Sequence, residues 1–523
     1  MSVVRTVSVP APDGSPAHCW AGMMIPQAVV RNPRNGHVLI ARYRTDRTMG
    51  VLDVDVSAAT ARTRSDTTLL DGAGAAVVFD QGQATATASN GNINDSHNSV
   101  SAVVDRQGDL HVTGNNHNTA LRYWRTTSPD DPTTLRSKDA PGPMEGVWVV
   151  KDRTGAEVRR YLDAGAELGA CSYPTFFRGP QGQVFLSWRN GESGRGNQFL
   201  YGYVESSKRW VSVAGEDVRY APYPDGRILL EGMSSDVSPY PSVPVPGPDG
   251  WWWMVWVWRG DPTDADTNGG LSAARSQDLR QWYGLDGTTL PPTITFGTPG
   301  VVVDDLPLTG SGLLNDATRI GFDRAGRPVI AYYKYVGSGS GRTTQLFVAR
   351  PDGASRQWVV TQVSAWSGAY DLARLGTAQQ GIAVTSVSTP VPAAAPDDVV
   401  IGYARSNGPA RAITVASGAS GASGASGASV GSAHSVADAP IPTTTTPPEL
   451  TQRSVDPARY PGLAVRTAVT DAFDDSGRRV AWTLRWDAGP YRNDGRAPDV
   501  AFPAEGSPLT LVLTDVDDSG VAG

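Results

Sequence analysis

The chain has 523 residues, enough for two to four average domains or for one large all-β fold. Its composition, with 58 glycines, 39 prolines, 15 tryptophans and only 19% charged residues, is typical of many short strands joined by tight turns. The net charge of −7 provides no basic surface for nucleic acid, so we expect no nucleic-acid partner. No apolar run approaches the roughly 18 residues of a membrane helix, and we expect no membrane partner.

Two further features bound the class of protein. The two cysteines are too few for a disulfide framework. The opening stretch MSVVRTVSVPAPDG has neither the apolar core nor the cleavage site of a secretory signal. The sequence therefore predicts a cytoplasmic protein, or a secreted one if a signal has been removed ahead of this stretch.

A hairpin pattern recurs along the chain: a strand, a turn that ends in glycine, and a second strand rich in aromatic and β-branched residues. Its turn glycines are Gly36, Gly108, Gly182, Gly250, Gly326, Gly381 and Gly477. Repetition of a strand unit indicates radial packing, in which each unit covers the face of the next. Seven units predict an all-β, seven-bladed β-propeller, because a closed ring leaves no long open sheet edge.

Composition divides the chain into three segments. Residues 1–415 are predicted to form blades that carry a catalytic face. Residues 416–450 are rich in Gly, Ala and Ser and then in Pro and Thr, which is typical of a flexible linker. Residues 451–523 alternate like strands, and we expect them to complete the last blade and close the ring; a separate small β domain is the alternative.

The hairpin of residues 100–113 holds the most suggestive residues. Its strands are joined by the turn Asp105-Arg106-Gln107-Gly108, so that His97, before the first strand, and His117, after the second, meet at one end. Asn98, Asn118 and Arg122 accompany them and are candidate substrate-binding residues. His111 lies within a strand, where a hydrogen-bonded structural role is expected.

Later hairpins repeat this placement of polar residues at strand ends. Tyr173 precedes one strand and Arg189 follows its partner. Tyr240 and Arg259 flank the next hairpin, around the run Trp251 to Trp258, which we interpret as a buried strand. Another hairpin contributes Asn315, Tyr333 and Lys334, and in a propeller such strand ends open on one face.

Structural explanations exist for each candidate. Tyr173 could pack at a blade entry, and surface arginines such as Arg189 and Arg259 are usually salt-bridged. The paired placement of His97 and His117 favours a functional role for these two. The chain contains no HExxH, GxSxG or phosphate-loop motif, so metalloprotease, hydrolase-elbow and nucleotide-binding interpretations have no support.

Four strings resemble a known family: NDSHNSVSAVVDRQGDLHVTGNNHNTALRYWR, YPTFFRGPQGQVFLSWRNG, WVWRGDPTDADTNGGLSAARSQDLRQW and GSGLLNDATRIGFDRAGRPVIAYYKY. They are similar to the BNR-repeat propellers of polysaccharide lyases, in particular ulvan lyases and L-rhamnose-α-1,4-D-glucuronate lyases. The resemblance spans roughly residues 15–365, and WTLRWDAGPYRNDG resembles the family's closing strand.

The resemblance implies β-elimination at a rhamnosyl-(1→4)-glucuronate bond of an acidic polysaccharide or oligosaccharide. One of the matching histidines, His97 or His117, would remove the C5 proton, a task that suits a neutral imidazole. Tyr173 matches the tyrosine that protonates the leaving oxygen or shares the acid–base duty. A tyrosine hydroxyl with its ordinary pKa of about 10 carries a proton to donate at neutral pH. Arg189 matches the residue that neutralises the carboxylate, and Tyr240 a substrate-binding tyrosine.

The sequence departs from the family pattern in two places, Asn268-Gly269-Gly270 and Asn315-Asp316. The resemblance also implies a divalent cation, calcium in preference to zinc, whose ligands the sequence does not assign. We expect a monomer. The alternatives are a glycoside hydrolase that releases rhamnose, and a glycan-binding propeller without catalysis.

Overall fold

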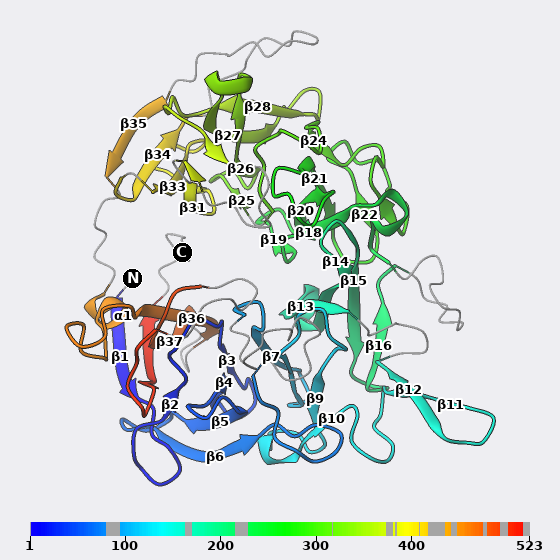
Figure 1. Ribbon diagram of the computed structural model, residues 1–523, viewed down its shortest axis with the longest axis vertical. Coiled ribbons are helices and arrows are strands. Elements are labelled where there is room, and N and C mark those ends of the chain that lie inside the picture. Colours follow the sequence, from blue (N-terminus) through cyan, green and yellow to red (C-terminus); the bar gives the residue numbers. More distant parts are fainter. Residues whose placement is uncertain are drawn as a thin grey trace.

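The structure is a computed structural model (Figure 1). It describes residues 2–79, 95–162, 170–214, 228–315, 317–372, 380–381, 384–406, 408–416, 435–440, 447–473, 479–491 and 500–515. Most of the expected linker 416–450, Gly477 and Asp316 lie outside these residues.

The fold is nearly all-β. The described residues include one short α-helix, α1 (Pro448–Thr451), and four 3₁₀ turns: η1 (Pro132–Thr134), η2 (Pro180–Gly182), η3 (Met233–Ser235) and η4 (Gly339–Gly341). None of the described helices is long and apolar enough to cross a membrane. The all-β class predicted from composition and turn residues is confirmed.

Seven sheets contain four or more of the described strands, and in most of them each strand pairs with its neighbour in the chain. The first of these comprises β3 (Ala28–Arg31), β4 (Val38–Tyr43), β5 (Met49–Asp55) and β6 (Arg62–Thr68). The second comprises β7 (Val100–Val104), β8 (Leu110–Gly114), β9 (Tyr123–Thr126) and β10 (Leu135–Ser137). The third comprises β13 (Cys171–Arg178), β14 (Val184–Glu192), β15 (Arg195–Val204), β16 (Arg209–Ser212), β17 (Leu230–Glu231) and β23 (Ile294–Thr295).

The remaining four sheets follow in the same manner. One holds β18 (Ser238–Pro241), β19 (Val245–Pro246), β20 (Trp252–Arg259), β21 (Asn268–Ser276), β22 (Trp282–Tyr283) and β24 (Val302–Asp304). The next holds β25 (Arg319–Phe322), β26 (Pro328–Val336), β27 (Thr343–Pro351) and β28 (Trp358–Gln362). Another holds β31 (Val384–Val387), β32 (Val391–Pro392), β33 (Val399–Arg405), β34 (Arg411–Val415) and β35 (Ser435–Pro440). The last holds β1 (Ser2–Ser8), β36 (Ala464–Phe473), β37 (Arg479–Ala488) and β39 (Thr510–Asp515).

Three strand pairs stand apart from these sheets. They are β2 (His18–Cys19) with β38 (Ser507–Pro508), β11 (Trp148–Lys151) with β12 (Glu157–Tyr161), and β29 (Tyr370–Asp371) with β30 (Gln380–Gly381).

The glycine turns predicted from the repeat are largely confirmed. Five of the glycines have positive φ between paired strands: Gly36, Gly108, Gly182, Gly250 and Gly326. The prediction for Gly381 is wrong, because this residue lies within β30 opposite Tyr370, and the neighbouring sheet instead pairs β31 with β33. The tryptophan run forms the buried strand β20, as expected.

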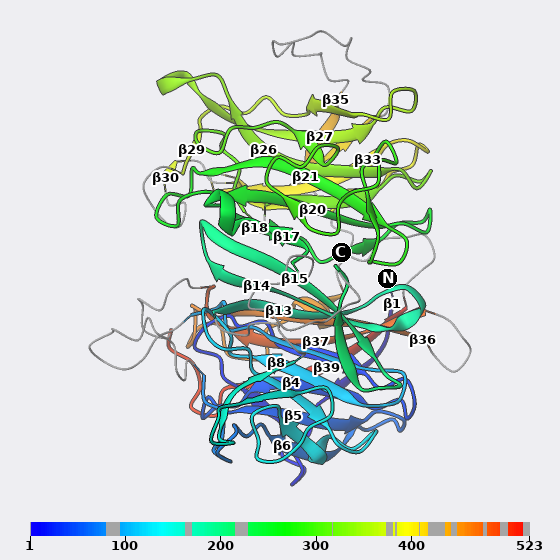
Figure 2. The same cartoon turned by 90° about the vertical axis from the view of Figure 1, so that its right-hand side faces the viewer.

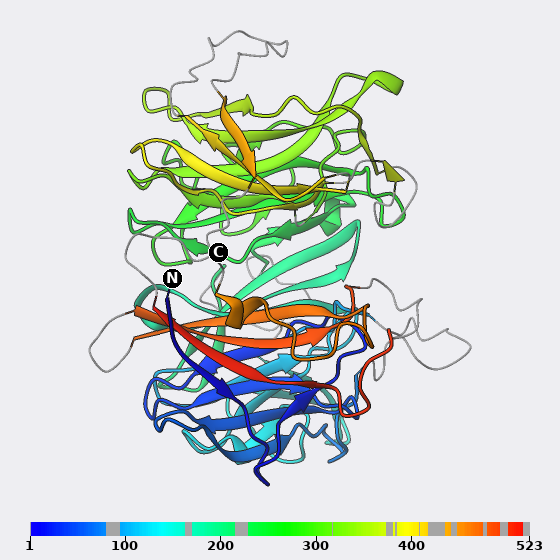
Figure 3. The ribbon, with the colours of Figure 1, turned by 90° about the vertical axis from the view of Figure 1, so that its left-hand side faces the viewer.

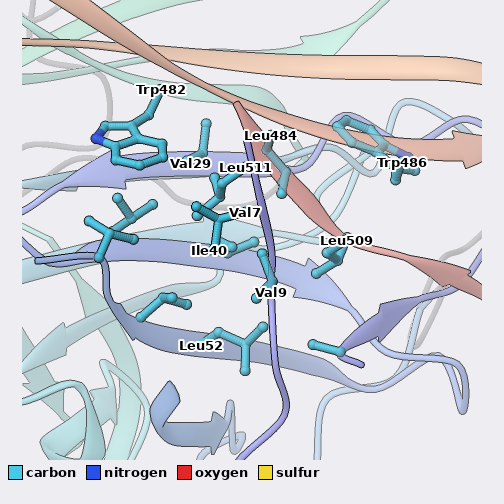
Figure 4. Close-up of a cluster of buried hydrophobic side chains, with 14 of the residues drawn as sticks. Val7, Val9, Val29, Ile40, Leu52, Trp482, Leu484, Trp486, Leu509 and Leu511 are labelled. Atoms are coloured by element: carbon cyan, nitrogen blue, oxygen red, sulfur yellow. The ribbon is translucent and has the colours of Figure 1, made fainter. Parts of the chain in front are cut away.

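Hydrophobic side chains join neighbouring sheets, from the sheet of β1, β37 and β39 through to that of β31–β35. One cluster joins the sheet of β1, β37 and β39 to that of β3–β6, through residues such as Leu511, Leu484 and Ile40 (Figure 4). Five further clusters join the successive pairs up to the sheet of β31–β35. Figure 1 accordingly shows the sheets following one another around an arc.

The last strands of the chain pair with the first. β39 lies between β1 and β37, with Ser2 opposite Asp515 and Ser8 opposite Thr510. Figure 3 shows the dark blue β1 beside the red and orange C-terminal strands, and Figure 2 shows β13–β15 between these lower sheets and the upper ones. Within the described ranges, no hydrophobic cluster connects the sheet of β31–β35 to that of β36–β39.

Candidate active site

The two histidines meet through a carboxylate that precedes the first of them. Asp95 lies in the loop before β7, and its Oδ1 accepts the backbone N–H of His97 at 3.0 Å, as is usual for Asp in a turn. His97 Nδ1 lies 2.5 Å from Asp95 Oδ1, and His117 Nδ1 lies 2.5 Å from Asp95 Oδ2. The two rings lie 4.3 Å apart between centroids. The hairpin thus brings both histidines together, as its sequence predicted.

Burial shapes the electrostatics of this group. The side chain of Asp95 is 1% exposed, whereas those of His97 and His117 are 17% and 15% exposed. Burial alone would raise the pKa of Asp95, but the hydrogen bonds from His117 and His97 outweigh this effect and hold the pKa well below its ordinary value. Asp95 is therefore an ionised, buried acceptor.

Tyr173 is aimed at the histidines by an irregularity in β13. The pairing of β13 with β14 shifts register between Ser172 and Thr175, and Tyr173 has a φ of 57°, which is uncommon for a residue with a side chain. Its ring centroid lies 5.5 Å from that of His97 and 5.7 Å from that of His117. A backbone held in this region at such a position points to function.

Arg189 lies beside Tyr173 because β14 pairs with β13. Ser172 is opposite Arg189, whose guanidinium lies 4.9 Å from the Tyr173 ring centroid and 5.1 Å from that of Tyr240. Arg189 Nη1 donates to the Tyr240 hydroxyl at 2.5 Å, and this hydroxyl also bonds to Ser193. Tyr173, Arg189 and Tyr240 thus form one stack, contributed by β13, β14 and β18.

Two further residues of the site went unrecognised in the sequence. Asp95 is one, although it stands in the quoted string NDSHN. The other is Tyr491, just after β37, whose ring centroid lies 5.7 Å from that of His97. This residue is 48% exposed. Its position in the family-like string PYRNDG was the available signal, but only the fold brings this C-terminal segment to His97.

The three candidates that accompany the histidines in the sequence, Asn98, Asn118 and Arg122, differ in burial and in their contacts. Asn98 is fully buried; its amide donates to the Asp95 carbonyl at 3.2 Å, so it orders the loop. Asn118 is exposed beside His117, and its backbone N–H donates to Ser172 Oγ at 2.9 Å. Arg122 is partly buried and donates to the Asn115 carbonyl, and therefore stabilises the loop between β8 and β9.

The candidates of later hairpins do not all reach this cluster. Arg259 Nη1 donates to Asn315 Oδ1 at 3.4 Å, which joins the end of β20 to the loop before β25. Tyr333 is 2% exposed and packs in the core between β26 and the sheet of β31–β35. Lys334 points to the opposite face of β26, where it pairs with Asp304 at 2.5 Å. Successive strand residues alternate faces, so Tyr333 and Lys334 do not serve one site together, which corrects that expectation.

A cation site could be formed only by groups that offer ligand atoms close together, as Asp95, His97 and His117 do. One ligand atom from each lies within 4.8 Å of the others. Two imidazoles and one carboxylate do not fit calcium, which takes six to eight oxygen ligands. The set contains donors that zinc accepts, but both Nδ1 atoms contact Asp95 directly at 2.5 Å, as N–H donors would. The described geometry fits protons here, and no cation ligand is assigned.

Successive sheets of four to six strands, joined by hydrophobic clusters, define an all-β repeat protein. Comparison with family sequence models identifies the family. The sequence model described as "BNR repeat-containing family member" matches residues 34–366, so the chain belongs to the BNR repeat-containing family. No curated protein sequence matches the chain significantly.

Solved structures are similar to the chain to different degrees. The crystal structure of polysaccharide lyase Uly1 is similar with a TM-score of 0.50 and 12% identity, over 99% of this chain and 100% of that one. A PL25 ulvan lyase has a TM-score of 0.46 and 11% identity over 94% and 96% of the chains. An endo-1,5-α-L-arabinanase from Thermotoga petrophila RKU-1 has a TM-score of 0.30 and 8% identity over 95% and 99%.

Proposed function

We propose that the protein is a lyase that cleaves a rhamnosyl-(1→4)-glucuronate bond of an acidic polysaccharide or oligosaccharide by β-elimination. The observation that carries the proposal is the grouping of His97, His117, Tyr173 and Arg189. These residues come from two successive sheets and supply a base, a proton donor and a cation within one cluster. The sequence resemblance to ulvan lyases and rhamnose-glucuronate lyases supports the choice of substrate.

Each group has a task in the reaction. An imidazole Nε2 of His97 or His117 takes the C5 proton of the glucuronate, and the electron pair forms the C4–C5 double bond as the C4–O4 bond breaks. The Tyr173 hydroxyl gives its proton to O4 of the departing rhamnosyl residue. Arg189, whose guanidinium lies over the rings of Tyr173 and Tyr240, would bind the uronate carboxylate, whose charge would otherwise oppose proton removal.

We further propose that the seven large sheets are the blades of a propeller closed by residues 451–523, and that the protein acts as a monomer. The pairing of β39 with β1 supports this closure. The blades within 1–415 carry most of the catalytic face, and Tyr491 completes it. The divalent cation implied by the resemblance remains a prediction without assigned ligands.

The test is ultraviolet absorbance during incubation with ulvan and, in parallel, with gum arabic. We expect a rising signal from conjugated 4,5-unsaturated uronate. The initial rate should fall on the order of 10²-fold or more in Tyr173→Phe, which keeps the ring but removes the hydroxyl proton. The preferred polymer identifies the substrate. Free rhamnose with a flat absorbance trace would contradict elimination and indicate the hydrolase; binding without any product would indicate a glycan-binding protein.

A further inference from the structure

Asp95 contacts His97 and His117 at the same time, so the two histidines share one carboxylate. Each of its carboxylate oxygens contacts a different imidazole, and both contacts use Nδ1 at 2.5 Å. An ionised carboxylate accepts hydrogen bonds and donates none. Each imidazole must therefore carry a proton on Nδ1, and a neutral imidazole with that proton has a lone pair on Nε2.

We propose that Asp95 is a positioning residue that fixes His97 and His117 in the same tautomer, with both Nε2 atoms unprotonated. The catalytic meaning of this inference rests on the proposed elimination. Either histidine is then ready to take the C5 proton, and the imidazolium that forms lies against the same carboxylate. The centroid of its ring lies 4.3 Å from that of the other imidazole.

The loop holds Asp95 rigidly enough for this role. Its carbonyl accepts the backbone N–H of Asn98 at 3.2 Å, and the Asn98 carbonyl accepts the Tyr43 hydroxyl at 2.9 Å. Ser96 Oγ donates to the Met24 carbonyl at 2.6 Å, which ties the loop to the segment before β3. Because these hydrogen bonds hold the loop in place, the Asp95 carboxylate can set the orientation of the two imidazole rings that contact it.

The variant Asp95→Asn gives an asymmetric result that tests the inference. An amide offers one acceptor oxygen and one donor NH₂. One histidine can keep its Nδ1 proton, whereas the other must accept at Nδ1 and carry its proton on Nε2. Nitrogen-15 NMR of the imidazoles, with His97→Gln and His117→Gln used for assignment, is expected to show two Nδ1–H tautomers in the wild type and one tautomer change in Asp95→Asn.

For the elimination reaction, we expect Asp95→Asn to lower kcat on the order of 10²- to 10⁴-fold with little change in KM, because the base is then held in the wrong tautomer. Asp53→Asn is the matched control. His37 Nδ1 lies 2.7 Å from Asp53 Oδ1, away from the site, so this variant alters another histidine–aspartate pair and should leave kcat unchanged.

The tautomers decide the inference independently of activity. An Nε2–H tautomer of either histidine in the wild type would overturn it, even if Asp95→Asn does not fold. A stoichiometric metal ion bound by the wild type and lost in Asp95→Asn would also overturn it. Two Nδ1–H tautomers in a protein that produces no unsaturated uronate would support the positioning role and contradict only the proposed function.

Discussion

Arg189 shows how single residues set the chemistry of the candidate site. Its guanidinium stacks on Tyr173 and Tyr240 and donates to the Tyr240 hydroxyl. A planar, delocalised cation stacks on aromatic rings and binds a carboxylate through two parallel hydrogen bonds, whereas a lysine ammonium does neither in the same way. The variant Arg189→Lys therefore keeps the positive charge and removes the planar guanidinium, so it distinguishes the contribution of the charge from that of the geometry.

We predict that Arg189→Lys lowers kcat/KM for elimination on the order of 10²-fold while the protein still folds, because the charge remains but the fork is lost. Initial rates by ultraviolet absorbance measure this effect. Arg275→Lys is the matched control, since Arg275 stacks on Trp251 at 4.4 Å outside the cluster and should leave the rate unchanged. Equal losses in the two variants would show that the effect is structural.

A second prediction concerns His111, which is fully buried and bonds to the Tyr123 hydroxyl at 2.8 Å. Burial lowers its pKa below the ordinary value of 6.5, although Asp105 opposes this. A protonated His111 therefore favours the unfolded chain, so its stabilising contribution is complete above about pH 6.5 and is lost as the pH falls below that value.

His111→Gln should thus flatten the fall in the free energy of unfolding between pH 7.5 and pH 5.5. One proton accounts for at most about 1.4 kcal/mol per pH unit. Urea denaturation at both pH values measures the slope. An unchanged slope in the variant would place the acid sensitivity elsewhere.

Sequence reasoning found residues whose signal is local and missed those that depend on the fold. His97 and His117 were found because one tight hairpin brings them together. Asp95 was missed because its role appears only once His117 reaches it across 22 positions. Tyr333 and Lys334 were grouped wrongly, although adjacent residues of a strand face opposite sides and could have been separated from the sequence alone.

At the scale of elements, the turn between β7 and β8 supports the histidine cluster. Asp105 Oδ1 accepts the N–H groups of Gln107 and Asp109 at 2.9 Å, and Gly108 has a φ of 93°. The sequence predicted this turn correctly because Asp and Gly encode it locally. It did not predict that Asp130, in the turn between β9 and β10 at the same end of the sheet, would approach Gly108 so closely.

Gly108→Ala is predicted to destabilise the protein by at least 1–3 kcal/mol, since a Cβ there would lie 2.4 Å from Asp130 Oδ1 in a backbone region that side chains rarely adopt. Thermal unfolding measures the loss. Gly353→Ala is the control, because a Cβ at Gly353 meets no atom within 4 Å. An equal melting temperature for the two variants would contradict this account of the turn.

For the whole molecule, the pairing of β1 with β39 makes the first and last described strands parts of one sheet. Their inward side chains pack on β3–β5, as Figure 4 shows for Leu511, Val7 and Ile40. The repeat in the sequence predicted a ring of strands, but it did not show which strands would pair across the ends. Pairings between distant segments leave no local pattern, because the alternation of residues within a strand is the same whichever strand it pairs with.

If the C-terminal sheet is integral to the fold, a cavity in it weakens the entire molecule. Leu511→Ala, at a fully buried position of β39, is predicted to lower the free energy of unfolding by about 2–5 kcal/mol in a single transition. Leu513→Ala, on the same strand but only partly buried, should have a smaller effect. A separate early transition confined to the C-terminal strands would instead indicate an independent domain.

The same pairing has a consequence during translation. The ribosome releases β1 long before β39, with about 500 residues between Ser8 and Thr510. At about 5–20 residues per second, β1 waits roughly 25–100 s for its partner. During that time an unpaired strand edge is open to other nascent chains. Arg5 and the exposed Ser2 and Ser8 of SVVRTVS supply the polar and charged side chains that discourage such contacts until synthesis is complete.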